Sequence, residues 1–292
     1  MFGAFNEIMM KRILFTVLII TGLFTSVFAQ SDYFLLPENF YPAKGDTLKL
    51  HLLGGSTFGK AREQKYIAKG GFKFALYDGG KGPVDLMPLV KENAPVILSY
   101  KYINTGMVIV EATQSHSDEY TKREFTRYLG NSGFDDVAST LKQFQQSFTQ
   151  KSIVSLKTLI KVDKNTGNVY DKPLKEDFEI VLKQNPYKLN YGDDITAVVL
   201  FKGKPIKAAK VDLVIRGIKG METPQVLSST EDGEIYFKLS REGTYLLHAV
   251  HLVPGKTAEL DFENWQTAVT FDFRSSDTMP TSYKEFGLGN FH

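Results

Sequence analysis

The side chains best suited to chemistry in this sequence are its five histidines, because the chain contains no cysteine. That lack excludes zinc–thiolate sites, iron–sulfur clusters, disulfide bonds and thiol catalysis. Imidazole binds nickel, copper and zinc well, so a metal site here would combine histidine with Asp or Glu. Three candidate metal ligands stand out, namely His116, His248 and His251. His51 alternates with leucines and is expected on a polar strand face, and the terminal His292 carries no information.

His248 and His251 form the closest pair of histidines. Residues three apart in a regular strand point to opposite faces, so the two could share one ion only across a bulge. The simpler interpretation is one half-buried and one half-exposed strand residue. His116 precedes a predicted helix, where Asp118 or Glu119 could bind a metal with it. Both acids are equally explained by the favourable charge at a helix N-terminus.

No familiar catalytic motif accompanies the histidines. The sequence has no Gly-x-Ser-x-Gly motif, phosphate-binding loop, dinucleotide fingerprint or His-Glu-x-x-His helix. The 22 Phe and 14 Tyr residues could stack on sugar rings, but large aromatic rings also fill the cores of β-sandwiches. We therefore predict a non-enzymatic protein. A balance of 35 basic and 33 acidic residues gives no reason to expect nucleic acid as a partner.

The start of the chain carries the three parts of a secretory signal peptide. Lys11-Arg12 precedes a mostly apolar run over residues 13–28, and small residues stand at Val27 and Ala29. The run is shorter than the roughly 20 residues that a membrane-spanning helix needs. We predict cleavage between Ala29 and Gln30, and a mature chain without a membrane span.

The elements that must position the histidines are mostly strands. Apolar and polar residues alternate over 47–52, 72–76 and 105–111, as in strands with one buried face. A helical hairpin interrupts this pattern over about 117–150, and a strand resumes at 152–162.

Ser117 is the expected N-cap of the first helix in this hairpin. Its buried face is predicted from Phe125, Tyr128 and Leu129. The second helix is predicted from an apolar stripe formed by Val137, Leu141, Phe144 and Phe148. Because both stripes are aromatic, we expect the hairpin to be a packing insertion rather than a lid.

A polar, turn-rich segment over residues 163–173 predicts a domain boundary. Seven short strands are predicted beyond it, at 178–183, 194–201, 209–216, 225–229, 234–239, 245–253 and 267–273. This spacing is typical of an immunoglobulin-like sandwich. We therefore expect an all-β protein with two β-sandwich domains, at residues 30–163 and 174–274, and a loose tail over 275–292.

Several phrases of the sequence occur in the order found in one family of exported bacterial proteins. They are Gln30-Ser31-Asp32-Tyr33-Phe34-Leu35-Leu36-Pro37, Asn185-Pro186-Tyr187, Leu200-Phe201-Lys202-Gly203-Lys204-Pro205, Thr230-Glu231-Asp232-Gly233, Gly243-Thr244-Tyr245 and Asn264-Trp265. The chain resembles this family of unknown function, whose members are described as similar to the NikM component of nickel uptake systems.

The resemblance implies a periplasmic binding or accessory protein near a system that takes up nickel or cobalt. Its partners would be a metal ion and a transporter or envelope protein. The family has a histidine near its mature N-terminus where this chain has Ser31, so that residue's role does not carry over. Two alternatives stay open, an envelope interaction module that pairs through strand edges and a carbohydrate-binding or carbohydrate-active protein.

Overall fold

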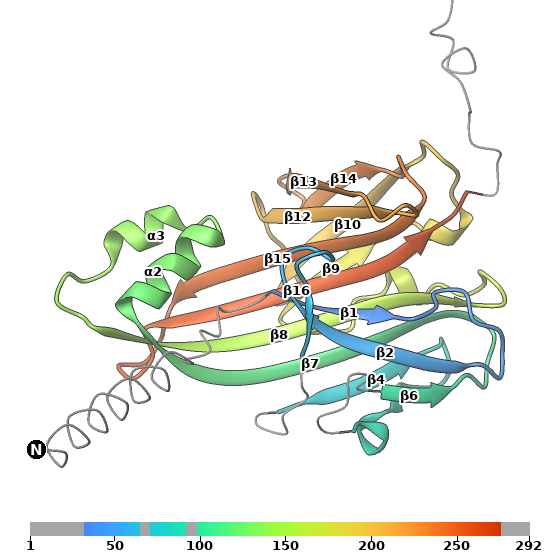
Figure 1. The fold of residues 1–292 in the computed structure, drawn as a ribbon, viewed down its shortest axis with the longest axis horizontal. Helices are drawn as coiled ribbons and strands as arrows, with labels where there is room; N and C mark the ends of the chain where they lie inside the picture. Colours follow the sequence, from blue (N-terminus) through green and yellow to red (C-terminus); the bar gives the residue numbers. More distant parts are fainter. Residues whose placement is uncertain (1–31, 65–70, 92–97, 276–292) are drawn as a thin grey trace, which may run out of the picture. The chain divides into compact units, whose positions relative to one another are not determined.

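An eight-stranded sheet forms the middle layer of the protein (Figure 1). The computed structural model describes residues 32–64, 71–91 and 98–275. Strand order in the central sheet is β13-β12-β15-β16-β8-β7-β4-β5. The strands are β4 (Lys73–Tyr77), β5 (Val84–Asp85), β7 (Gly106–Thr121), β8 (Ser147–Val162), β12 (Lys210–Gly217), β13 (Glu222–Ser228), β15 (Gly243–Pro254) and β16 (Phe262–Phe273).

Two four-stranded sheets accompany the central one, and the prediction of an all-β fold is confirmed. The first contains β1 (Tyr33–Pro37), β2 (Thr47–Gly54), β3 (Arg62–Glu63) and β6 (Leu98–Lys101). The second contains β9 (Phe178–Leu182), β10 (Asp194–Phe201), β11 (Lys204–Pro205) and β14 (Glu234–Lys238). Short 3-10 turns lie at Met87–Leu89, Val169–Asp171 and Pro186–Lys188.

The central sheet buries both of its faces, and β7 illustrates how. Val108 and Val110 belong to a first core with residues of β1, β2 and β6. Met107 and Ile109 belong to a second core with residues of β9, β10 and β14. Successive residues of a strand point to opposite faces, so the alternation along β7 gives a three-layer arrangement. The end of β8 is buried at nearly every position, as expected for a strand covered on both faces, and these buried positions include the polar Lys157 and Thr158.

The expected boundary at residues 163–173 does not separate two sheets. Strand β16, from the second expected domain, pairs in parallel with β8, from the first, between Phe262↔Gln150 and Thr270↔Thr158. The described residues accordingly fall within one compact unit that begins at Ser31. The expectation of two separate sandwiches is thus corrected, because a β16–β8 pairing across 100 residues leaves no local signal in the sequence. The predicted signal peptide, and the predicted tail beyond Ser275, lie outside the described residues.

The second half of the chain nevertheless has the strand arrangement of an immunoglobulin-like sandwich. Strands β9, β10 and β14 pair in one sheet and face β13, β12, β15 and β16 in the other. All seven predicted strands are present, with ends that shift by a few residues. The Tyr245 hydroxyl donates a hydrogen bond of 2.7 Å to the carbonyl of Arg241, the contact known as a tyrosine corner.

An ionic network attaches the segment before β9 to the central sheet. Lys157 of β8 and Glu179 of β9 form an ion pair in which both side chains are buried. Glu179 also accepts hydrogen bonds from the backbone N–H groups of Leu174 and Lys175, at 2.9 and 3.0 Å. Beside them, the buried Glu111 accepts from Lys73 at 3.0 Å.

The predicted helical hairpin is present between β7 and β8, but its helices begin and end at different residues from those predicted. Strand β7 continues through Ser117 to Thr121, and Thr121 caps α2 (Lys122–Asn131) in a capping box with Glu124. Strand β7 is longer than predicted because its ladder with β8 continues to Thr121↔Ser147. This pairing satisfies the backbone N–H and C=O groups of residues 117–121, which would otherwise need a helix to pair them.

The stripe predicted for the first helix is confirmed, since Phe125, Tyr128 and Leu129 are buried in a third cluster with Phe148. The second helix, α3 (Asp135–Thr140), ends before the predicted stripe does. Phe144 is 88% exposed in the following loop, and Phe148 belongs to β8. No helix in the described part of the chain is long and apolar enough to cross a membrane.

Candidate functional site

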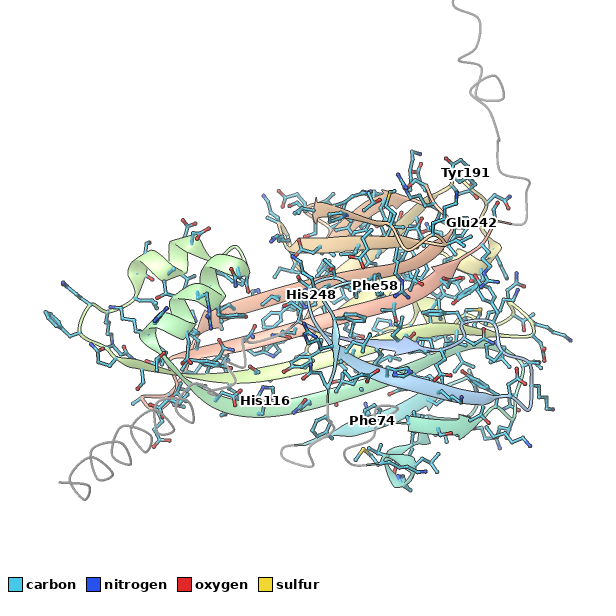
Figure 2. The ribbon with its side chains drawn as sticks, viewed as in Figure 1. Phe58, Phe74, His116, Tyr191, Glu242 and His248 are labelled. Atoms are coloured by element: carbon cyan, nitrogen blue, oxygen red, sulfur yellow. The ribbon has the colours of Figure 1, made fainter. Side chains whose placement is uncertain are left out.

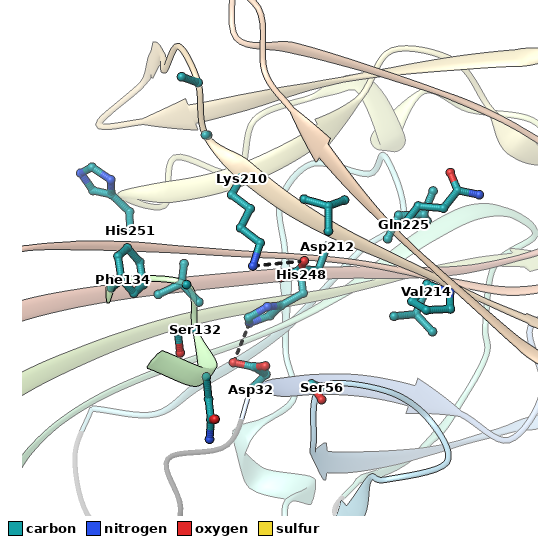
Figure 3. Close-up of a pocket in the computed structure, with 18 of the residues that line it drawn as sticks. Asp32, Ser56, Ser132, Phe134, Lys210, Asp212, Val214, Gln225, His248 and His251 are labelled. Atoms are coloured by element: carbon teal, nitrogen blue, oxygen red, sulfur yellow. Dashed lines mark ion pairs between the residues drawn. The ribbon is translucent and has the colours of Figure 1, made fainter. Parts of the chain in front are cut away.

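A cavity of about 700 Å³ opens where β15 extends past β12 (Figure 3). The β12–β15 ladder ends at Val211↔Ala249, whereas β15 continues to Pro254. Its walls come from the start of the described chain, the α2–α3 turn, β12, β13 and β15. Those walls include Asp32, Ser132, Phe134, Lys210, Asp212, Gln225, His248, Val250 and His251.

His248 stands at the inner wall of this cavity and is 5% exposed. Its Nε2 atom lies 3.6 Å from Oδ1 of Asp32, and Asp212 faces it across the β12–β15 ladder. Asp212 in turn lies 3.5 Å from the amino group of Lys210 (Figure 3). Among the described residues, Nε2 of His248 has no hydrogen-bond partner. The imidazole is therefore buried opposite the Asp32 carboxylate, at ion-pair distance but without a hydrogen bond.

His251 lies on the other face of β15, as the spacing predicted. Its ring packs at 4.4 Å from the ring of Phe201 and at 6.1 Å from that of Trp265. Burial, assisted by the charge of Lys202, lowers the pKa of His251 below its ordinary value. The neutral imidazole thus contributes to an aromatic group rather than to the His248 pair.

His116 lies within β7 rather than ahead of a helix, which corrects its predicted position. Its Nε2 atom is 3.1 Å from Oδ2 of Asp118, two residues along the same strand face. The hydrogen bond from His116 lowers the pKa of Asp118. Figure 2 shows His116 and His248 on different strands of the central sheet. Within the described ranges, no three His, Asp or Glu side chains form a group that could hold a metal ion.

Sequence reasoning missed a group of neutral polar side chains behind the cavity, here called the amide cluster: Tyr128, Gln150, Ser152, Asn264 and Gln266. The three amide side chains are at most 1% exposed. The ladder register aligns Asn264 with Ser152, and Gln266 lies two residues further along the same face of β16. Tyr128 covers the cluster from α2, with Ser132, Asn264 and Gln266 close to its hydroxyl. The signal in the sequence was the polar residues at every second position of the last strand.

Few hydrogen bonds within the amide cluster have good geometry, although Ser132, Asn264 and Gln266 interact with the Tyr128 hydroxyl. Gln150 Nε2 donates to the Ser152 hydroxyl at 3.0 Å. Five side-chain atoms lack a hydrogen-bond partner among the described residues, namely Tyr128 Oη, Gln150 Oε1, Asn264 Oδ1, Asn264 Nδ2 and Gln266 Oε1. Burial raises the pKa of Tyr128, so its hydroxyl stays neutral. Folded proteins pair almost all buried polar groups, which makes this concentration unusual.

The amide cluster adjoins the cavity at several points. Ser132, which lines the cavity, lies beside the Tyr128 hydroxyl, and the charge of Asp32 acts on the same hydroxyl. Val250, also in the cavity wall, faces Gln266 across the β15–β16 ladder. The cavity wall therefore carries charged groups, and the amide cluster lies behind that wall without lining the cavity.

Comparison with known proteins gives one family match. The model of a domain of unknown function (DUF4198) matches residues 28–253. No curated protein matches the chain.

Solved structures are matched only at low similarity. A tetra-tandem repeat in the extending region of a large adhesion protein is 8% identical, covers 84% of this chain and 50% of that chain, and has a TM-score of 0.22. The D0–D1 domain of intimin is 10% identical over 82% of this chain and 97% of its own, with a TM-score of 0.20. A segment of two fibronectin type-III domains from chicken tenascin is 11% identical over 82% of this chain and 99% of its own, with a TM-score of 0.20. Structural similarity at this level supports no inference about this chain.

Proposed function

Since the chain belongs to the DUF4198 family of unknown function, we propose that it is an exported, non-enzymatic binding protein that takes a small ligand in the cavity beside His248. The observation that carries the proposal is the buried imidazole of His248 at the wall of a cavity of about 700 Å³, where its Nε2 faces Asp32 without forming a hydrogen bond among the described residues. Ligand sites are concave and hold a few convergent polar groups, and this cavity has both properties. The sequence supplies no catalytic motif to set beside it.

Export to the periplasm is part of this proposal and rests on the signal-peptide pattern before Gln30. Intact-mass analysis of the protein recovered from the periplasm of an expressing bacterium tests it. The expected mass is that of a chain starting at Gln30. A protein that keeps residues 1–29 and stays in the cytosol would contradict export.

Binding in the cavity is tested by screening the mature protein for increases in melting temperature. The panel contains transition-metal ions, neutral sugars, amino acids and organic acids. A true ligand stabilises the folded state in proportion to its occupancy, so its effect grows with concentration. The effect should be lost in Val250→Trp, which fills the cavity, and kept in Ile218→Trp, an exposed residue after β12 that does not line the cavity. A panel without any stabilising compound, or equal effects in both variants, would refute the proposal.

A narrower form of the proposal makes the ligand a nickel or cobalt ion, as the NikM resemblance implies. His248 Nε2 and Asp32 Oδ1, 3.6 Å apart, are the two described atoms best placed to bind it. Calorimetric titration with Ni²⁺, Co²⁺, Cu²⁺ and Zn²⁺ tests this form. Binding tighter than millimolar should disappear in His248→Gln and persist in His116→Gln, because His116 lies on another strand. Affinity weaker than millimolar for every ion would end the metal form and leave the wider proposal standing.

A further inference from the structure

The charged side chains that line the cavity give the proposed site a chemical preference. We propose that Lys210 and Asp212 bind the charged head of an α-amino acid, and that the apolar surface around Val226 holds an apolar side chain of that ligand. This inference rests on the proposed function, because the ligand occupies the same cavity of about 700 Å³.

The first step is the floor of the cavity. The strand ladders pair Asp212 of β12 with His248 of β15 on one side and with Val226 of β13 on the other. All three residues line the cavity. His248 is buried, whereas Val226 is 67% exposed on the edge strand of the central sheet. The floor therefore runs from a buried, polar inner end to an open, apolar outer end.

The second step is to find which charges a ligand can use. The charged residues in the cavity wall, apart from histidine, are Asp32, Lys207, Lys210 and Asp212. Lys207 already forms an ion pair with Glu231, which does not line the cavity. Asp32 lies 3.6 Å from the imidazole of His248. Lys210 and Asp212 remain as the positive and negative groups open to a ligand.

The third step is the state of this remaining pair. Lys210 Nζ lies 3.5 Å from Oδ1 of Asp212, and within the described ranges no hydrogen bond joins the two side chains (Figure 3). Both side chains are partly exposed, so a ligand can reach them. An ammonium group has three donors and a carboxylate has acceptor sites for several hydrogen bonds.

A zwitterion matches this pair better than a ligand with one charge. Its carboxylate accepts from Lys210 and its ammonium donates to Asp212, so both contacts are charge-assisted hydrogen bonds. A purely anionic ligand would bring a like charge towards Asp212, and a purely cationic ligand would bring one towards Lys210. The carboxylate and ammonium of an α-amino acid are attached to one carbon atom, which suits two side chains that lie this close together.

The fourth step is the outer end of the floor. Val214 faces Pro224 across the β12–β13 ladder, and both line the cavity beside Val226. An apolar side chain that extends from the charged head over these residues would remove apolar surface from water, which favours binding. The cavity therefore favours an α-amino acid with an apolar side chain over glycine.

The test is isothermal titration calorimetry of the mature protein with L-leucine, L-methionine and L-phenylalanine. Each amino acid is compared with the amine that lacks its carboxylate and with the acid that lacks its ammonium. For leucine these are 3-methylbutylamine and 4-methylpentanoate. At least one amino acid should bind at least about tenfold more tightly than its amine, its acid and glycine. Equal or tighter binding of the amine or the acid, or no binding of the three amino acids, overturns the inference.

Two variants test the charged pair, and each removes one charge at nearly constant volume. Lys210→Met should lower the affinity for the amino acid to that of its amine, and Asp212→Asn should lower it to that of its acid. The matched controls are Lys238→Met and Asp194→Asn, which alter an exposed ion pair of 2.8 Å between β14 and β10, outside the cavity. The controls should leave every affinity unchanged.

A third variant tests the apolar end of the floor. Val226→Ser should weaken the binding of the amino acid and leave the binding of glycine unchanged, because only the apolar side chain is expected to contact Val226. An equal loss for both ligands would contradict this part of the inference.

The outcomes distinguish this inference from the wider proposal. If the amino acids fail while metal ions or other compounds bind in the cavity, the inference falls and the proposed function stands. If nothing binds in the cavity, both fall. If an amino acid binds equally well to the wild type, Lys210→Met and Asp212→Asn, its charged head is held elsewhere and the inference is wrong.

Discussion

The two faces of the central sheet bury polar side chains in opposite ways. On the face of the second core, Lys157 and Glu179 form a buried ion pair that joins β8 to β9. On the face of the first core, Asn264 and Gln266 lie equally deep with atoms that have no hydrogen-bond partner among the described residues. Charged groups are buried only with a counter-charge, so the ionic network connects layers. The neutral amides lie close to the Tyr128 hydroxyl of α2, and their neighbour Val250 lines the cavity. The comparison indicates that buried charges are neutralised by pairing across layers, whereas buried neutral amides remain with few hydrogen bonds of good geometry.

The largest effect is expected from breaking the ionic network. Lys157→Met leaves Glu179 buried without its counter-charge, so the free energy of unfolding should fall by about 3–5 kcal/mol. Urea denaturation followed by fluorescence of the single Trp measures the loss. The double variant Lys157→Met/Glu179→Gln should recover part of it, since no unpaired charge remains. A loss below about 1 kcal/mol would mean that this pair does not hold the layers together.

The neutrality of the amide cluster can be broken by adding one charge. Gln266→Glu places a carboxylate where the described structure offers no positive partner. This change should lower the free energy of unfolding at pH 7 by about 2 kcal/mol. Stability should return on acidification as the new carboxyl becomes protonated. Chemical denaturation at pH 7 and pH 5 provides the measurement, with Gln225→Glu at the open side of the cavity as the control. Equal stability of Gln266→Glu and the wild type at pH 7 would show that the cluster tolerates charge.

The cover over the amide cluster depends on the start of α2. Thr121→Ala removes the side chain that accepts a hydrogen bond from the backbone N–H of Glu124, and should cost about 1 kcal/mol. Because Tyr128 lies on this helix, hydrogen exchange should accelerate over residues 122–131 and stay unchanged in β9. Exchange that accelerates equally in both elements would indicate global destabilisation and would contradict a local role for the cap.

The smallest effect concerns pH and the Glu111 carboxyl of the ionic network. Burial raises the pKa of Glu111 above its ordinary value. At pH values between the ordinary pKa of Glu111 in the unfolded chain and its raised pKa in the folded protein, the folded state binds more protons than the unfolded state. The contribution of Glu111 to stability therefore falls as pH rises through this range. Glu111→Gln should remove that decline, whereas Asn264→Leu should leave the pH dependence as it is. Unfolding free energies measured from pH 4 to pH 8 provide the check, and identical profiles for Glu111→Gln and the wild type would contradict it.

Much of the fold could be predicted from local pattern. Alternation and spacing located the seven strands of the second half and β2, β4, β7 and β8 of the first, but not β1 or β6, and the helical stripe at Phe125, Tyr128 and Leu129 located α2. The start of that helix was misplaced because Ser117 and Thr121 are both suitable caps, and only the pairing of β7 with β8 decides between them.

The candidate site was harder to predict. The opposite faces of His248 and His251 followed from spacing alone, but the nearness of Asp32 to His248 did not. The amide cluster draws on α2, β8 and β16, and the last two are adjacent only through a parallel pairing between distant segments. Alternation in the sequence predicts which face of its strand a residue lies on. It does not predict which other strand will pair with that strand.

The parallel pairing of β16 with β8 also sets an order of assembly. Ribosomes make β8 more than 100 residues before β16, yet β8 lies between β7 and β16 in the sheet. Until residue 262 and its successors arrive, one long side of β8 exposes backbone groups that can pair with another chain. Nascent or truncated chains that stop before β16 should therefore be prone to aggregation, and folding should conclude with the C-terminal strand.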